Sequence, residues 1–393
     1  MNHWPMKPLL ELTTIVTTRV EPFEGKRCYV PTAALNAGKL TAADEVDFSS
    51  KPSRADVIAR EGDIIFARMQ ATNKVTVVTK VTQNYIWSTG FAALRPSRYL
   101  RSRYLMYYVA SPYFQLIKDK YCTGATQKSL TNAGISEITI PLPSLEQQDR
   151  IIELLDEAGK LRELRAQAER RTAEFIPALF HQMFGDPVAN SRKWKRQAFG
   201  ELLDRIDSGW SPICQDRPPQ SDEWGVVKLG AVTTCEYLDT ETKAMLAETA
   251  PRSEFEIKVG DVLFSRKNTY ELVAACAFVF KTRPKLMLSD LIFRFRFRAD
   301  AQLDPIFLWG LLTERNKRKQ IQAMAGGSAG SMPNISKGRL ITLPIELPPL
   351  PLQKEFAERV KEIRALETAQ TRSRARLDAL FASLLDKAFK GEL

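Results

Sequence analysis

The sequence EGDIIFAR at residues 61–68 returns 198 positions later as VGDVLFSR at residues 259–266. Further along the chain, LPSLEQQ at 142–148 returns as LPPLPLQ at 347–353, with an offset of 205. The matched segments keep their order and the offset grows slowly, so the second copy carries small insertions. Collinear matches of this kind indicate an internal repeat of roughly 200 residues that is used twice.

Both halves follow the same order of local patterns. Short β-like runs (75–78 and 274–280) precede a helical stretch (103–120 and 305–324), a loop rich in small residues and a proline-rich exit. Such runs, mixed with helix and separated by turn residues, predict an α+β domain in each half. The predicted boundaries are a mixed α/β domain at 1–144, a long helix at 145–184, a second mixed domain at 185–350 and a second long helix at 351–393.

A long helix with apolar residues at alternating spacings of three and four closes each half. The predicted seam consists of Ile151, Leu154, Ala158, Leu161, Phe175 and Leu179 in the first helix and of Phe356, Ile363, Leu366, Leu377, Leu380 and Leu384 in the second. Because such a seam needs a partner helix, we expect an antiparallel coiled coil, about 50 Å long, and a pseudo-two-fold internal repeat. The alternative is two separate amphipathic helices, each packed on its own domain.

The chain has 393 residues and a net charge of +11. Residues 1–144 hold 18 basic and 11 acidic residues, and residues 185–352 hold 24 and 20, whereas residues 145–184 hold 6 and 8. The positive excess therefore lies in the mixed regions, as expected for two basic modules that bind nucleic acid. Hydrophobic residues make up 44% of the chain, which excludes wholesale disorder.

The sequence also bears on the compartment and on metal chemistry. No apolar run approaches the ~18–20 residues of a membrane helix, and no signal peptide is recognisable, so we expect a cytoplasmic protein without membrane contact. The 5 cysteines are scattered and the chain has only 2 histidines. A disulfide framework, a zinc site and histidine-based catalysis are therefore not expected.

Loops in each half carry side chains suited to contacts with DNA bases. Arg and Lys can bind guanine, and Asn and Gln can bind adenine. The candidate DNA-binding residues are Arg68, Gln70, Asn73, Lys74, Thr126, Gln127, Lys128, Arg266, Lys267, Asn268, Ser331 and Asn334. Ordinary turn chemistry is an alternative explanation for them. Separately, the run IFRFRFR at 292–298 predicts a strand with phenylalanines on the core face and arginines on a face that is either solvated or available to DNA.

Motifs for catalysis are mostly absent from the sequence. It contains no phosphate-binding GxxxxGK[ST] loop, no GxSxG elbow and no aromatic signature of an amino-methyltransferase. One enzymatic alternative is a Mg-dependent DNA nuclease that uses Asp239, Glu256 and Lys258. The other alternative is a coiled-coil scaffold that binds only protein.

The passages TGATQKSLTNAGISEITIPLPSLEQQDRI and LPPLPLQKEF, together with EGDIIFAR and VGDVLFSR, resemble specificity subunits of type I restriction-modification enzymes. The resemblance covers essentially the whole chain, and the helix entry at 142–148 and 347–353 is its most specific part. The second copy departs from the usual form, with Leu352 before Gln353 where the first copy has Gln147 before Gln148.

The resemblance implies a non-catalytic subunit of a bacterial or archaeal complex. Each mixed domain would be a target recognition domain for one half of a split, asymmetric target in double-stranded DNA. The helices would set the spacing between the halves and dock modification (methyltransferase) subunits, usually two, and a restriction subunit would join them. No cofactor would bind this chain, because S-adenosylmethionine, ATP and Mg would belong to the partner subunits.

Overall fold

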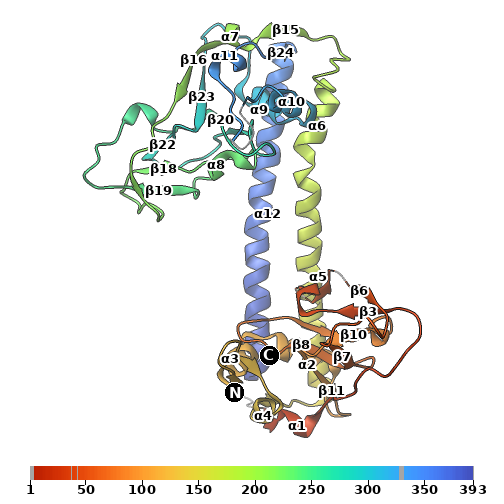
Figure 1. Ribbon diagram of the computed structural model, residues 1–393. Coiled ribbons are helices and arrows are strands. Elements are labelled where there is room, and N and C mark those ends of the chain that lie inside the picture. The colour runs from red at the N-terminus through yellow and green to blue at the C-terminus, as the bar shows by residue number, and fades with distance from the viewer. Residues whose placement is uncertain (1–3, 37, 42, 327–331, 393) are drawn as a thin grey trace. The chain divides into compact units, whose positions relative to one another are not determined.

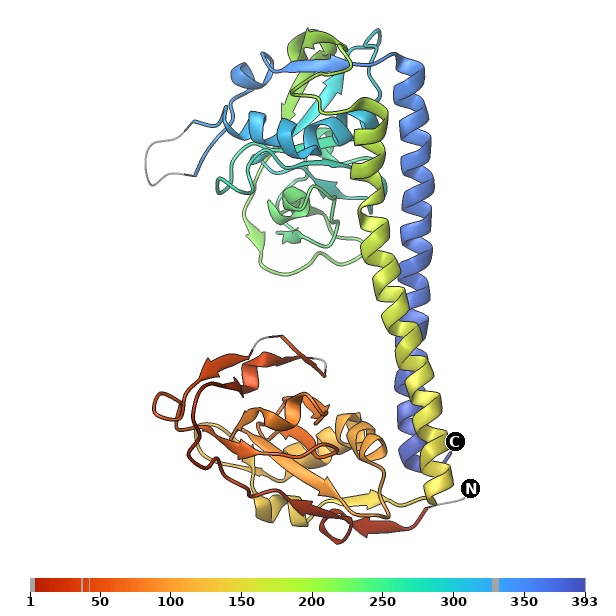
Figure 2. The same cartoon turned by 90° about the vertical axis from the view of Figure 1, so that its right-hand side faces the viewer.

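The computed structural model describes residues 4–36, 38–41, 43–326 and 332–392. The chain divides into two compact units, Met1–Gln167 with Thr371–Leu393, and Ala168–Gln370. Each unit combines one mixed region with parts of both long helices (Figures 1 and 2). The predicted fold class, two mixed regions joined by long helices, is confirmed. None of the helices in the described part of the chain is long and apolar enough to cross a membrane.

Unit 1 is built on two four-stranded sheets. The first is antiparallel, in the order β2 (Thr13–Ile15), β11 (Phe91–Pro96), β8 (Ile64–Ala67) and β9 (Val75–Val77). The second has the order β6 (Asp44–Val46), β3 (Arg27–Val30), β10 (Ile86–Ser88) and β7 (Ala55–Ile58), and its β3–β10 pair is parallel. The other strands are β1 (Met6–Pro8) with β14 (Thr139–Pro141), β4 (Leu35–Asn36) with β5 (Lys39–Leu40), and β12 (Cys122–Thr123) with β13 (Ser129–Leu130). The short helices are α1 (Leu9–Leu12), η1 (Thr32–Ala34), η2 (Thr82–Asn84), α2 (Ser102–Ala110), α3 (Pro112–Lys120) and α4 (Asn132–Ser136).

Unit 2 repeats this plan. Its antiparallel sheet has the order β16 (Leu203–Ser208), β23 (Ile292–Phe297), β20 (Val262–Ser265) and β21 (Cys276–Phe278). Its second sheet has the order β17 (Cys214–Gln215), β19 (Thr242–Met245), β18 (Gly225–Val227) and β22 (Leu286–Met287), and β18 and β22 are parallel. β15 (Lys195–Ala198) pairs with β24 (Pro344–Leu347). The short helices are α7 (Phe199–Leu202), α8 (Gly230–Thr233), η3 (Ser253–Phe255), α9 (Pro305–Thr313), α10 (Arg315–Gln322) and α11 (Lys337–Leu340). In the second sheet, β19, β18 and β22 repeat β6, β3 and β10, whereas β17 is additional and a bridge between Glu256 and Met287 stands in place of the β7–β10 pair. The internal repeat is therefore confirmed for the first sheet and for these three strands of the second.

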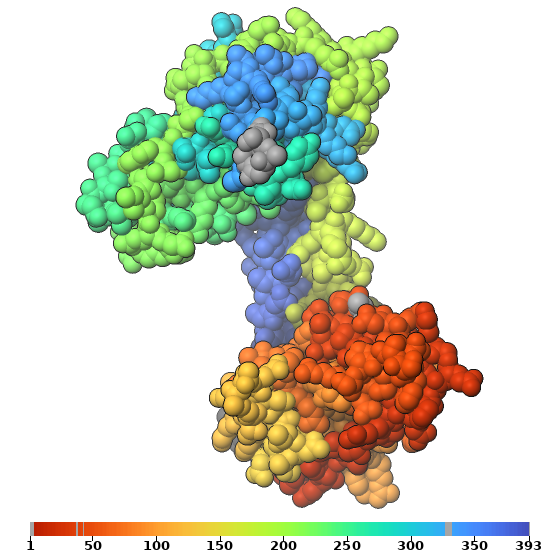
Figure 3. Space-filling view, viewed as in Figure 1, coloured from red at the N-terminus to blue at the C-terminus, as the bar shows by residue number. Residues whose placement is uncertain are grey.

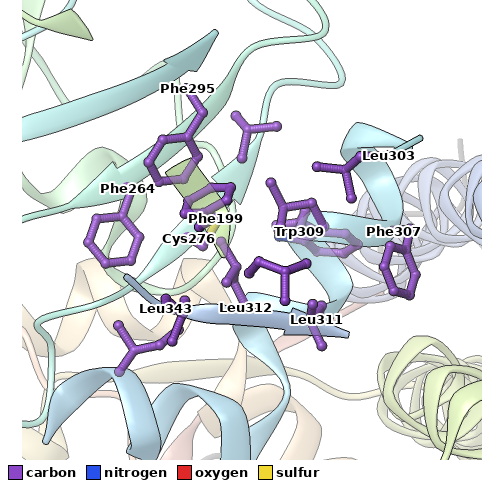
Figure 4. Close-up of a cluster of buried hydrophobic side chains, with 14 of the residues drawn as sticks. Phe199, Phe264, Cys276, Phe295, Leu303, Phe307, Trp309, Leu311, Leu312 and Leu343 are labelled. Carbon is purple, nitrogen blue, oxygen red and sulfur yellow. The ribbon is translucent and has the colours of Figure 1, made fainter. Parts of the chain in front are cut away.

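The strands of the repeated EGDIIFAR and VGDVLFSR segments are buried on both faces. In β20, Val262 and Phe264 face the main core beside α9, while Leu263 faces the smaller core beneath the second sheet. Figure 4 shows this main core, in which Phe264 and Phe295 from the sheet approach Trp309 and Leu312 from α9. Alternate residues of a strand point to opposite faces, so an all-apolar strand fits a sheet that is covered on both sides.

The glycine and aspartate of these segments form the turn before each strand. Gly62 and Gly260 have φ values of 88° and 93°, which favour glycine. Asp63 accepts hydrogen bonds from the backbone N of Arg60 and, at 2.8 Å, from both Nε and Nη2 of Arg95. The repeated Gly-Asp pair is therefore explained by turn geometry and by a buried carboxylate that the neighbouring strand neutralises.

The long helices are α5 (Leu145–Ala173), α6 (Phe175–Phe184) and α12 (Leu350–Lys390), so the predicted helix at 145–184 is interrupted at Glu174. Inside unit 1, Arg162 of α5 donates to Asp378 of α12 at 2.6 Å. Inside unit 2, Phe180 of α6 contacts Phe356 of α12, with ring centroids 5.6 Å apart. The helices run antiparallel within each unit and contact each other there, so the alternative of two helices that each pack only on their own domain is wrong.

The predicted seam residues differ widely in burial. Ile151, Ala158 and Phe356 are buried, and Leu179, Ile363, Leu377 and Leu384 are half-buried. By contrast, Leu154, Leu161, Phe175, Leu366 and Leu380 are 39–51% exposed. Leu155, Ile176, Phe180, Val360 and Leu385 are buried instead. The mixed regions also cover these helices, so the buried stripe of each helix is wider than a two-helix seam and is turned relative to it.

A buried glutamine joins the start of each long helix to the mixed region before it. Gln148 Oε1 accepts from the backbone N of Arg101 at 2.8 Å, while its Nε2 donates to the carbonyls of Tyr99 (3.0 Å) and Pro143 (3.1 Å). Gln353 makes the same three contacts, with the N of Asp304 (2.9 Å) and the carbonyls of Gln302 (3.1 Å) and Pro348 (2.7 Å). Both glutamines are 0% exposed. We call each of these sets of three bonds the glutamine joint.

Candidate nucleic-acid interface

In unit 1 the structure brings two of the predicted loops together. The loop after β8, residues 68–74, lies beside the loop between β12 and β13, residues 124–128. The backbone N of Leu130 donates to Arg68 at 2.9 Å, and the N of Gln70 donates to Lys128 at 3.1 Å. The two candidate segments, which the sequence predicts separately, therefore form one surface.

Three predicted residues of the 68–74 loop use their side chains inside the fold. Arg68 donates to the carbonyls of Phe91 and Leu130 and to Oδ1 of Asn132, at 2.9–3.1 Å. Burial lowers the pKa of its guanidinium. Asn73 donates to Ala110 at 3.0 Å, and Lys74 donates to Thr32 at 2.8 Å. These three side chains hold the ends of the loop in place, and a role in DNA contact stays a prediction for them.

The middle of this surface carries the side chains that are free to meet a ligand. Gln70, Thr126, Gln127 and Lys128 are all exposed. Within the described ranges, Gln70, Thr126 and Lys128 have no side-chain hydrogen bond, and Gln127 Nε2 contacts only Met69 Sδ, at 2.9 Å. The segment around α3 and α4, coloured yellow-orange, forms part of the exposed face of unit 1 in Figure 3. Two amides, one hydroxyl and one ammonium thus meet on an accessible loop pair.

Sequence reasoning missed the two residues that shape this loop. Lys118 of α3 is 0% exposed, and its Nζ donates to the carbonyls of Met69 (3.1 Å) and Thr72 (2.7 Å). The neighbouring Asp119 accepts from the backbone N of Ala71, with both carboxylate oxygens 3.1 Å away. Burial lowers the pKa of Lys118, and the charge of Asp119 opposes that shift. No sequence signal marks this pair, because a Lys-Asp dipeptide in an amphipathic helix is ordinarily solvated.

In unit 2 the predicted residues also gather at one place. Arg266 Nε donates to Asn334 Oδ1 at 3.3 Å, and its guanidinium lies 5.2 Å from the Phe293 ring centroid. Lys267 is half-buried and its backbone forms a bridge with Asn334. Asn268 is buried, and its Oδ1 accepts from the N of Thr269 at 2.8 Å. Ser331, the remaining candidate, lies outside the described residues. The N of Ile335 donates to Arg266 at 2.8 Å, as the N of Leu130 donates to Arg68 in unit 1, so Asn334 occupies the place of Ser129. Arg266 therefore corresponds to Arg68, but its asparagine partner comes from a different position of the repeat.

Another missed residue holds the loop of unit 2. Gln322 of α10 donates from Nε2 to the carbonyls of Tyr270, Glu271 and Val273 at 3.1–3.3 Å. It lies eight residues after the N-cap Glu314, as Asp119 lies eight residues after the N-cap Ser111. The second short helix therefore fixes the loop in both units, with different side chains.

The alternating arginines around β23 differ in exposure: Arg294 is buried, Arg296 is half-buried and Arg298 is exposed. The outer face predicted from IFRFRFR is therefore wrong for Arg294. Arg294 is 1% exposed and binds Asp207, Asp261 and the carbonyls of Glu254 and Glu256. Burial would raise the pKa of Asp207, but hydrogen bonds from its neighbouring arginines hold that pKa below its ordinary value. The β23 surface packs against the second sheet, so Arg294 neutralises buried carboxylates and is not available to DNA.

The nuclease alternative finds no support in the geometry. The carboxylate oxygen Oε1 of Glu256, a proposed ligand of the metal ion, accepts a hydrogen bond from the backbone N of Lys285 at 2.8 Å and is therefore already engaged. Lys258 is exposed on a turn and donates its backbone N to Asp261. Among the residues that the structure describes, no group of three or more His, Cys, Asp or Glu side chains is placed to hold a metal ion. Asp239, Glu256 and Lys258 are therefore not supported as a catalytic set.

The family comparison agrees with the repeated architecture. Residues 40–170 and 220–376 match the family described as type I restriction modification DNA specificity domain. The chain belongs to this family. The specificity subunit of the type I restriction enzyme EcoKI of Escherichia coli K12 is 24% identical over 99% of this chain and 89% of that subunit. The EcoEI specificity subunit of E. coli is 33% identical over 184 residues, which cover 45% of this chain but only 31% of that subunit.

Solved structures of this family share the fold. A structure concerned with complex assembly and conformational transition of the type I R-M system is similar over 100% of this chain and 99% of that chain, with a TM-score of 0.68 and 24% identity. The type I S subunit from M. genitalium matches over 99% of this chain and 96% of that one, with a TM-score of 0.56 and 12% identity. These likenesses extend over the whole chain, so the fold with two mixed regions and long helices is shared with both structures.

Proposed function

We propose that this chain is the DNA sequence-recognition subunit of a type I restriction-modification complex. Each mixed region contacts one half of a split target in double-stranded DNA. The observation that carries this proposal is the pair of units with one framework and different loop chemistry. Gln70 is exposed in unit 1, whereas Asn268, its counterpart under the offset of 198, is buried in unit 2, and Lys267 stands where unit 1 has Met69. Different side chains on equivalent loops favour different half-sites, and hence an asymmetric target.

The chain selects DNA and leaves the chemistry to its partners. Its positive excess lies in the mixed regions, where phosphate contacts would position each unit while a few base contacts give specificity. In this proposal, modification subunits carry S-adenosylmethionine, and a restriction subunit uses ATP and Mg. A base that is to be methylated leaves the helical stack, and the pocket that receives it belongs to the modification subunit.

The exposed apolar residues of the long helices support a docking role. In unit 1, Leu161 of α5 is 51% exposed and Leu380 of α12 is 49% exposed. In unit 2, Leu366 and Phe175 are 44% and 46% exposed. Each pair corresponds to the other under the repeat offset of 205. Exposed apolar side chains at matched positions favour two modification subunits, one for each unit.

The decisive experiment is an exchange of residues 185–350 for those of a relative, followed by sequencing of DNA methylation in cells that also express the modification subunit. We expect one half of the methylated sequence to change and the other half to stay. A change in both halves, or in neither, would contradict the modular proposal.

Docking and spacing can be tested separately. Leu161→Lys together with Leu380→Lys should abolish co-purification with the modification subunit, while exchange of the exposed Lys160 for Ala should not. Insertion of four residues near Arg165 should alter the spacer of the target or prevent assembly. A variant that methylates DNA fully and keeps the spacer length of the target unchanged would contradict the proposal that the helices set this spacing.

The scaffold alternative predicts no intrinsic DNA affinity. Filter binding of the purified complex to duplex DNA at increasing salt distinguishes the two functions. Release of counterions from several phosphate contacts predicts a steep fall in affinity with salt. Binding that is absent at low salt would favour a scaffold that contacts only protein.

A further inference from the structure

The loop after β8 is held in a conformation that its own sequence does not favour. Ala71 has a φ of 54°, in the left-handed region that non-glycine residues adopt only when their surroundings hold them there. The backbone N of Ala71 is bound by Asp119, and the carbonyls of Met69 and Thr72 on either side are bound by Lys118. We call Lys118 and Asp119 the α3 clamp.

The clamp acts on the backbone, so it fixes the path of the loop without using the side chain of Gln70. That side chain is exposed, lies between the two clamped carbonyls in sequence, and has no hydrogen-bond partner in the part of the chain that the structure describes. The backbone N of Gln70 is bound to Lys128, which joins the clamped loop to the exposed 124–128 loop. The clamp therefore determines where a free amide group stands beside Gln127 and Lys128.

A buried ammonium is a costly way to hold a loop. Lys118 is fully buried, and its Nζ donates hydrogen bonds to main-chain carbonyls. The nearest carboxylate oxygen of Asp119 is 3.7 Å from this Nζ. Buried charges are normally paired or replaced by apolar residues. In unit 2 the corresponding loop is held by the neutral Gln322 through three carbonyls. In each unit the second short helix, α3 or α10, thus holds the loop that follows the central strand. The two helices use different side chains, so each loop is held in its own way.

We propose that Gln70 determines specificity at one base position of the half-site contacted by unit 1, and that the α3 clamp is its positioning element. This inference rests on the proposed function in DNA recognition. Gln can form two hydrogen bonds with one base edge only when its backbone is held at a fixed distance from that edge. Loss of the amide removes the contact, and loss of the clamp misplaces it.

The test is the methylated sequence produced by the complex of this chain with its modification subunit, determined by sequencing of genomic DNA. Gln70→Ala should relax one position of one half-site by roughly 10-fold to 100-fold in discrimination. Asp119→Ala should relax the same position, and Asp119→Asn, which keeps an oxygen acceptor for Ala71, should restore it. Lys118→Met should act like Asp119→Ala, whereas Lys120→Met, an exposed lysine on the same helix, should have no effect.

The other half-site is an internal control, because these variants leave unit 2 unchanged. A purely structural role would lower methylation at all sites without changing the sequence that is methylated. If Gln70→Ala and Asp119→Ala leave the methylated sequence unchanged while the parent complex methylates a split target, the inference is wrong and the proposed function stands. If the parent complex methylates no defined sequence, the proposed function itself fails.

Discussion

Replacement of Gln148 by leucine tests how strongly a recognition region is attached to its helix. The side chain is 0% exposed, and its three hydrogen bonds all go to backbone groups: the N of Arg101 and the carbonyls of Tyr99 and Pro143. Leucine has a similar size but can make none of these bonds. The substitution therefore leaves the buried carbonyl of Pro143 and the partly buried Arg101 N–H and Tyr99 carbonyl without this partner.

The expected cost follows from these three groups. Loss of the partner of a buried polar group lowers stability by about 1–3 kcal/mol. With values from the lower half of this range, the three groups together lower stability by about 4–5 kcal/mol. Burial of the leucine side chain returns about 1–2 kcal/mol. The net loss of local stability is then about 3 kcal/mol, which corresponds to opening that is on the order of 100-fold more frequent.

The neighbouring Gln147 provides a matched control. Its Oε1 accepts from the backbone N of Ser144 at 3.0 Å in an exposed capping box, so Gln147→Leu should cost only about 0.5–1 kcal/mol. Hydrogen–deuterium exchange of peptides that cover residues 99–105 measures the joint directly, which avoids a two-state treatment of a chain with two units. Equal exchange rates in the two variants would refute the reasoning.

Three further predictions concern unit 2. Arg294→Met removes hydrogen bonds to the half-buried carboxylate of Asp207 and to the buried carboxylate of Asp261, and should lower the free energy of unfolding by about 3–5 kcal/mol in urea titration at neutral pH. Because the folded-state pKa of Asp207 is lowered, its contribution to stability is present above the unfolded pKa, about 3.9, and is lost as the pH falls towards the folded value. Urea titrations at decreasing pH should therefore show a smaller loss of stability in Arg294→Met than in the parent chain. Finally, Thr172→Val leaves the buried Nε2 of Gln370 without its 2.9 Å partner, so the Thr172→Val/Gln370→Leu double variant should be more stable than Thr172→Val alone by about 1 kcal/mol. A double variant that melts below Thr172→Val would contradict this last expectation.

The sequence predicts the repeat and the class of fold because these depend on strong local signals. The Gly-Asp turn needs a glycine at positive φ and a carboxylate for an arginine, so it leaves the same mark at Gly62 and Gly260. The face of the long helices is harder to predict. Leu161 and Leu380 continue the heptad pattern yet are exposed, because the pattern records apolar residues without saying which partner covers them.

The interface is less predictable from the sequence than the fold. Composition singles out two candidate loops, and the structure brings them together in unit 1. Composition cannot distinguish Gln70, whose side chain makes no hydrogen bond within the described residues, from Arg68, whose three hydrogen bonds reach residues 23 to 64 positions away. Nor can it find Lys118, since its burial depends on a loop some 46 to 49 positions earlier. Contacts between distant segments decide which polar side chains remain available.

The glutamine joint explains how a specificity subunit can vary its recognition regions while it keeps one architecture. Every partner of Gln148 and of Gln353 is a backbone N–H or carbonyl, so the joint does not depend on the side chains around it. The partner N–H belongs to Arg101 in one unit and to Asp304 in the other, which differ even in the sign of their charge. A recognition region can therefore change its exposed loops, its clamp and its buried charges, provided that its backbone meets the same glutamine. Selection for a new DNA target can act on one unit without loosening its attachment to the helices.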